Sequence, residues 1–197
     1  MSGALPTTPA FRTYQLSSID PTSISISQSG KRFAEKLPGH IWMIKATYPP
    51  LEDDDFWTLY AFALKQRGKY GTFTVQIPKT NRGSYGGTPL VDGASQTGAT
   101  LDVKGGTPNI TGWAKAGDIF NIAGTTKVYL ITDDADTDGS GNVTLNLMAN
   151  LMDSPADSAA LTFSGVNFTM YFAKDEQITS VQPGGFYSFD VDMIEAL

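Results

Sequence analysis

The sequence predicts a mainly β fold that is all-β apart from one principal α-helix. Glycine occurs 20 times and proline 11 times in 197 residues, and short runs of β-branched and aromatic residues alternate with turn residues along most of the chain. This pattern favours short strands joined by turns over a bundle of helices. Residues 53–67 have the apolar spacing of an amphipathic helix. Hydrophobic residues make up 41% of the chain, which is enough to form a core.

The predicted helix has clear start and stop signals. The three aspartates of residues 53–55 can accept hydrogen bonds from the free N–H groups of a first turn and suit the positive end of the helix dipole. Gly68 stands where a left-handed residue ends a helix. We expect one face of this helix to pack on a sheet, so that Trp57→Ala would cost about 3–5 kcal/mol. The residues predicted to form the core are Trp42, Phe56, Trp57, Tyr60, Leu64 and Phe73.

Strand candidates lie on both sides of the helix. Residues 41–48 and 72–77 are β-branched and aromatic runs, each followed by proline. Residues 11–16, 24–27 and 32–37 predict a meander of antiparallel strands, because polar and apolar residues alternate as in a sheet with one wet face. Further candidates are residues 90–91, 99–103, 110–113, 119–122, 126–131, 143–147, 161–163, 168–172 and 186–195.

The order of these strands predicts one domain inserted into another. Residues 79–88 are rich in Gly, Ser and Thr, which marks a boundary. A lone terminal strand is not a stable domain, so residues 186–195 are expected to return to the first sheet. We therefore expect residues 1–79 together with 180–197 to form a β-sandwich with the helix. Residues 80–179 are expected to form an inserted small β-barrel or β-sandwich domain with flanking linkers.

Charge and composition exclude several classes of ligand. The formal net charge of −6 argues against nucleic acid, whose binding depends on Lys and Arg contacts to phosphate. Cysteine is absent, so neither a disulfide framework nor a thiolate metal site is available. No apolar run approaches 18 residues, and the start of the chain lacks the pattern of a signal peptide. The sequence thus predicts no nucleic-acid partner and no membrane span.

No set of catalytic residues stands out. The only histidine, His40, follows Pro38 and Gly39, and we expect it to be an exposed turn residue. A nucleophile elbow is missing, and no pattern singles out a pair among the 20 acidic residues. The sequence predicts no enzymatic activity, no catalytic residue and no cofactor.

One short motif resembles the start of a calcium-binding loop. Asp134, Asp136 and Asp138 precede Gly139, and carboxylate oxygens suit a hard cation. The twelfth position is Leu145, where such a loop needs a bidentate Glu. The three aspartates are therefore only a weak candidate for a metal site, and a polar turn is the favoured interpretation.

Tryptophan offers one candidate for a sugar contact. Trp42 and Trp57 lie in segments with a core pattern, which leaves Trp113 as the residue able to stack on a glycan. This alternative describes a carbohydrate-binding or adhesin-like β module that attaches to a host surface. Burial of Trp113 is the competing interpretation.

Several stretches resemble proteins of tailed-bacteriophage tail tips, in particular distal tail proteins. They are Trp42-Met-Ile-Lys-Ala-Thr-Tyr-Pro-Pro, Ala61-Phe-Ala-Leu-Lys-Gln-Arg-Gly and Phe73-Thr-Val-Gln-Ile-Pro, joined by Gly98-Ala-Thr-Leu-Asp-Val, Trp113-Ala-Lys-Ala-Gly-Asp-Ile-Phe-Asn-Ile and Gly139-Ser-Gly-Asn-Val-Thr-Leu-Asn-Leu. The resemblance covers about residues 30–175 and lies in order and texture, not in an invariant motif.

The resemblance implies a structural virion protein without individual functional residues to transfer. Such proteins form rings, commonly sixfold, that join the tail tube to the hub, tip or baseplate. The implied partners are further copies of the chain, the tail tube and the hub or tip proteins. The implied location is the phage tail, after synthesis in the cytoplasm of the bacterial host. Tube, collar and baseplate roles stay open beside the distal tail role.

Overall fold

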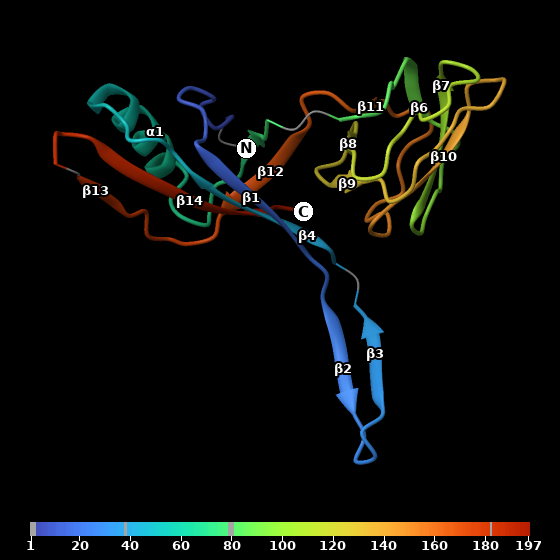
Figure 1. Ribbon diagram of the computed structural model, residues 1–197, viewed down its shortest axis with the longest axis horizontal. Coiled ribbons are helices and arrows are strands. Elements are labelled where there is room, and N and C mark those ends of the chain that lie inside the picture. The colour runs from blue at the N-terminus through green and yellow to red at the C-terminus, as the bar shows by residue number, and fades with distance from the viewer. Residues whose placement is uncertain (1–2, 38, 79–80, 182) are drawn as a thin grey trace. The chain divides into compact units, whose positions relative to one another are not determined.

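The computed structural model describes residues 3–37, 39–78, 81–181 and 183–197. Within these ranges the fold is mainly β, with one helix, α1 (Asp53–Lys65), and no closed barrel (Figure 1). The predicted fold class is confirmed, while the β-sandwich geometry stays a prediction. The strands are β1 (Thr13–Ile19), β2 (Thr22–Ile26), β3 (Arg32–Lys36), β4 (Ile41–Thr47), β5 (Phe73–Gln76), β6 (Gly87–Val91), β7 (Thr100–Gly106), β8 (Ile119–Ile122), β9 (Val128–Leu130), β10 (Val143–Asn146), β11 (Leu161–Thr162), β12 (Asn167–Phe172), β13 (Thr179–Val181) and β14 (Tyr187–Glu195).

The chain divides into two units. The first, which we call the sheet unit, contains the residues up to Val75 together with Thr169–Ala196. The second consists mainly of Gln76–Phe168, and we call it the intervening unit. The predicted boundary between residues 79 and 80 lies outside the described residues. The predicted domain limits stay predictions.

The sheet unit is built on a sheet whose strand order is β1-β4-β14-β12-β5, with β13 also paired to β14. The pairings of β14 with β4 and with β12 are antiparallel. Along β14, Phe189, Val191 and Met193 are buried, whereas Asp190 between them is exposed. The last strand of the chain thus lies in the middle of this sheet and has one apolar face.

Helix α1 packs on the apolar face of the sheet. The Phe56 ring stacks on the Tyr187 ring at 4.2 Å between centroids and meets Phe189 edge-on. Leu59 and Ala63 follow Phe56 at helical spacing and are buried with it. Among the predicted core residues, Trp42 and Phe73 are buried as well. Aromatic packing of this kind contributes beyond the area that it buries.

Two residues assigned to the core on sequence are on the surface. Trp57 is 52% exposed and Leu64 is 54% exposed. The predicted core role of both is wrong, and Tyr60 is half-buried. The reason is that apolar residues occupy two faces of α1, so periodicity alone fits either phase. The structure buries the stripe that begins at Phe56 and leaves the stripe that begins at Trp57 outside.

The predicted N-terminal meander is wrong. Strand β1 pairs with β4, and β2 pairs with β3, so these four strands are two sections of one extended hairpin. All the residues of β2 and β3 are exposed. We call residues 22–36 the arm. Alternation predicts one buried face, but no element of the described chain covers either face of the arm.

The intervening unit contains two small sheets that share one core. Their strand orders are β10-β7-β6 and β11-β8-β9. Leu101 and Leu145 of the first sheet pack in the same cluster as Phe120 and Tyr129 of the second. The glycine-rich composition suits the tight connections between these short strands.

Three local predictions fail in detail. Residues 110–113 form turns where a strand is predicted, and β6 begins at Gly87 within a predicted loop. Strand β13 lies between residues 168–172 and 186–195 and is missing from the predicted strands. Each of these segments is short, so packing of neighbouring strands outweighs the preference of its own residues.

Candidate assembly surfaces

Each aspartate of the calcium-like motif makes its own separate contacts. The Asp138 carboxylate accepts hydrogen bonds from the backbone N–H groups of Asn142 and Ser140, both at 2.8 Å. These bonds hold the pKa of Asp138 below its ordinary value. The carboxylate therefore closes a polar turn.

The other two aspartates of this motif contact different groups. Asp134 pairs with Lys115 at 2.7 Å, and this lysine is the main cause of its lowered pKa. Asp136 accepts a hydrogen bond from the Gly112 N–H at 2.6 Å. Within the described part of the chain, no cluster of His, Asp or Glu is arranged to hold a metal ion. The motif thus builds turns of the intervening unit.

Trp113 does not offer a surface for stacking a glycan. Its side chain is fully buried, and its indole N–H donates to the Gly86 carbonyl at 3.0 Å. The rings of Tyr85 and Phe163 pack edge-on against it. The predicted glycan contact at Trp113 is therefore wrong, because the core of the intervening unit covers the ring.

His40 is also buried, although the sequence predicts an exposed turn residue. Only 4% of its surface is accessible, and its ring meets Trp42 edge-on at 4.9 Å. The Nε2 atom lies 2.9 Å from the Ser18 hydroxyl. Packing against the start of β4 explains the burial, and these contacts give His40 a structural place.

Asp118 holds the entry of the chain into the intervening unit. Its carboxylate is fully buried and accepts hydrogen bonds from the N–H groups of Arg82 and Gly83 and from the Tyr85 hydroxyl. Burial is the main cause of the raised pKa of Tyr85, and the bond to Asp118 adds to it. The carboxylate thus fixes an irregular segment that has no strand partner of its own.

A second polar cluster ties a loop to β7. The Lys104 ammonium lies 2.8 Å from Asp157 and 3.5 Å from Asp92. The bond from Lys104, helped by the Gly93 N–H, lowers the pKa of Asp157 to about 2. Both carboxylates are about half-exposed, so solvent screens these pairs. They fasten a surface loop and form no reactive centre.

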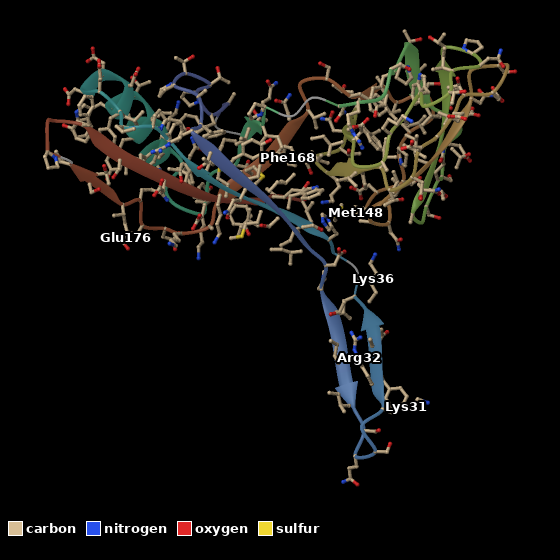
Figure 2. The ribbon with its side chains drawn as sticks, viewed as in Figure 1. Lys31, Arg32, Lys36, Met148, Phe168 and Glu176 are labelled. Carbon is tan, nitrogen blue, oxygen red and sulfur yellow. The ribbon has the colours of Figure 1, made fainter. Side chains whose placement is uncertain are left out.

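The arm presents two chemically different faces. Because directly paired residues of antiparallel strands share a face, the register places Ile24 beside Ala34 and Ile26 beside Arg32. Ser25 pairs with Phe33 on the other face. Lys36 lies on the first face and Glu35 on the second. We call the first, made of Ile24, Ile26, Arg32, Ala34 and Lys36, the basic face of the arm; Figure 2 shows Lys31, Arg32 and Lys36 spaced along the arm.

Helix α1 carries the complementary chemistry on its exposed side. Trp57, Ala61 and Leu64 recur at helical spacing and are all exposed. Asp53 and Asp54 stand one turn before them, and Asp53 accepts hydrogen bonds from the Trp57 indole and the Tyr187 hydroxyl. We call the set Asp53, Asp54, Trp57, Ala61 and Leu64 the outer face of α1. It is apolar with an acidic end.

The sequence predicts an interior position for apolar residues of both surfaces, such as Trp57 and Leu64 of the helix. For the arm, the signal is an alternating run of serine and isoleucine without a second apolar layer to cover it. For the helix, the signal is apolar residues on more than one face, which is typical of a helix that is covered on several sides.

A comparison with known families matches the intervening unit. Residues 79–166 match the family model described as the distal tail protein pb9, B domain. None of the curated proteins compared with the chain matches it. No helix in the described ranges has the length and apolar character needed to span a membrane. The match supports a structural role in a phage tail, as a virion component that associates with other tail proteins. The predicted resemblance of this chain to phage distal tail proteins is therefore confirmed.

Proposed function

We propose that the protein is an oligomeric ring component of the distal tail or tail tip, where it connects the tail tube to the hub or baseplate. The proposed assembly is a homo-oligomer, with six copies as the expected ring. Its other partners are the tube and the hub or tip proteins. We further propose that the chain is made in the cytoplasm of the bacterial host and acts without catalysis. The match of residues 79–166 to a structural tail protein supports this function.

The arm is the structural observation that carries the oligomeric part of the proposal. An isolated two-stranded hairpin is marginally stable in water, and exposed apolar residues on a strand pair favour contact with another chain. Ile24, Ile26 and Phe33 are each at least half exposed on the arm. Contact with a neighbouring chain would cover these residues and hold the arm in place.

We assign the two parts of the chain different roles in the ring. Residues 1–79 with 180–197 are proposed to form the ring itself, because they carry both the arm and the outer face of α1. The domain of residues 80–179 is proposed to face outward. No observation favours carbohydrate binding through Trp113, since the ring of that residue is buried.

Native mass spectrometry of the full chain tests the ring. We expect an oligomer, with six copies as the main species. A variant in which an Asn-Gly turn replaces residues 22–36 is expected to be monomeric while its far-ultraviolet circular dichroism still shows a folded β protein. A wild-type chain that stays monomeric at high concentration, with its tail partners also present, would contradict the proposed ring.

A further inference from the structure

Two surfaces of the sheet unit are apolar, oppositely charged and uncovered in the single chain. On the basic face of the arm, Ile24 is 52% exposed and Ile26 is 69% exposed. On the outer face of α1, Trp57 and Leu64 are exposed to a similar degree. We propose that the basic face of one copy docks on the outer face of α1 of the next copy. The inference rests on the proposed homo-oligomer and names the surfaces that join its subunits.

Charge favours this pairing of surfaces. Arg32 and Lys36 lie on the basic face, and the register puts the arm's Glu35 on the opposite face. At the start of α1, Glu52 and the three following aspartates are exposed and place four negative charges together. Within the described residues, no ion pair involves Arg32, Lys36 or Asp54. Docking would bring opposite charges together at the rim of an apolar contact.

Apolar shape favours the same pairing. The arm offers an apolar strip, because Ile24 and Ile26 are two residues apart on one strand and Ala34 lies directly opposite Ile24 on the other. The outer face of α1 offers a ridge in which Trp57 and Leu64 stand two turns apart with Ala61 between them. Trp57 is also positioned in advance, since its indole N–H donates to Asp53 at 3.0 Å. A positioned tryptophan is a typical anchor of a protein interface.

Ring symmetry explains why the partner is a second copy. A closed ring of identical subunits needs two different surfaces on each subunit, so that the first surface of one subunit docks on the second surface of the next. The arm and the outer face of α1 are such a pair on one chain. A symmetric dimer would instead need a surface that complements itself, and the basic face of the arm, with two cations and no acid, would repel its own copy.

Cysteine cross-linking tests the contact, because the natural chain contains no cysteine. Chains carrying Ile26→Cys are mixed with chains carrying Leu64→Cys and oxidised. We expect a disulfide-linked heterodimer. Ser25→Cys is the matched control, since Ser25 neighbours Ile26 but lies on the other face of the arm. It is expected to link to Leu64→Cys at least about tenfold less, because its side chain points away from the contact.

A charge exchange tests the same contact without a cross-link. One chain carries Arg32→Glu with Lys36→Glu, and a second chain carries Asp54→Lys with Ala61→Lys. In an assembly of either variant alone, the arm of one copy meets a helix of like charge on the next copy. Assembly of each variant is therefore expected to weaken at least about tenfold. A mixture of both is expected to recover assembly, because each arm then meets a helix of opposite charge. Circular dichroism of each chain checks that it is folded.

The outcomes separate this inference from the proposed function. Oligomers that form in both charge variants alone, or that link Ser25→Cys as well as Ile26→Cys, would overturn the docking and leave the ring intact. A wild-type chain that is monomeric in native mass spectrometry would overturn the ring and the docking together. Loss of assembly in each variant with recovery on mixing supports both.

Discussion

At the scale of single residues, neighbours in the sequence have opposite roles on α1. Phe56 is fully buried, and its ring stacks on Tyr187, whereas more than half of Trp57 is exposed. Aromatic size therefore says little about the contribution of either residue to stability. The contribution of each residue depends on which face of the helix packs on the sheet.

Alanine substitution at these two positions is expected to have unequal effects. Phe56→Ala should lower the free energy of unfolding by about 3–5 kcal/mol, because it empties a core site. Trp57→Ala should lower it by about 1 kcal/mol or less, since it removes an exposed side chain. Urea denaturation of the full chain measures both. A larger loss for Trp57→Ala than for Phe56→Ala would show that α1 packs in the phase first expected from its sequence.

The Asp118 carboxylate is expected to be required for the stability of the intervening unit. Asp118→Asn keeps the size of the side chain but removes its negative charge and replaces one of the two accepting oxygens with an N–H donor, which then faces a backbone N–H group. We expect a loss of about 3 kcal/mol, since buried hydrogen bonds to a charged group are worth about 1.5–3 kcal/mol each. Tyr85→Phe removes one of these bonds and is the milder control. Chemical denaturation that gives equal stability for wild type and Asp118→Asn would contradict this role.

At the scale of elements, the sequence predicts what local chemistry determines. Strong strand runs such as β4, β12 and β14 and the position of α1 were predictable, because propensity and turn residues agree there. The face that each element buries was not predictable. Ile24 and Leu64 look like core residues because their periodicity shows that a face is apolar, while burial depends on whether another element covers it.

For the same reason, the sequence alone does not show which residues form the two candidate surfaces. Register decides that Arg32 shares a face with Ile26 while Glu35 does not, and register follows from the turn that joins β2 to β3. The amide of Ser27 bonds to the Lys31 carbonyl in that turn, and Gly30 adopts a positive φ of 80°. Trp113 was undecided on sequence because its burial depends on segments far from it in the chain.

The loop that carries Asp157 is expected to lose its attachment in acid. The Lys104 ammonium lowers the folded-state pKa of Asp157 to about 2, below its value of about 3.9 in an unfolded chain. Its contribution to stability is therefore complete above about pH 4 and is lost as the pH falls through about 2. Asp157→Asn should lower the melting temperature at pH 7 and have a much smaller effect near pH 2. The exposed Asp153→Asn is the matched control, and a similar shift for both variants would contradict a specific bond to Lys104.

At the scale of the whole molecule, two sets of boundaries can divide the chain into units. They differ in the unit to which they assign β12. Predicted domain limits of 80–179 would assign β12 to the inserted domain, whereas β12 pairs with β14 and lies next to β5 in the large sheet. Its residues Met170 and Phe172 are buried. Removing β12 would expose the edge of β14 at Met193–Glu195 and part of the core.

Two deletions are expected to separate these assignments. Replacing residues 81–165 with a short glycine linker keeps β12, and the remaining chain should fold and still form the oligomer, because the arm and the outer face of α1 are intact. Replacing residues 80–179 removes β12 and should give an unfolded or aggregated chain. Circular dichroism measures folding, and native mass spectrometry measures assembly. A folded, oligomeric product from the longer deletion would place β12 outside the ring-forming part. A folded but monomeric product from the shorter deletion would mean that the intervening unit takes part in assembly.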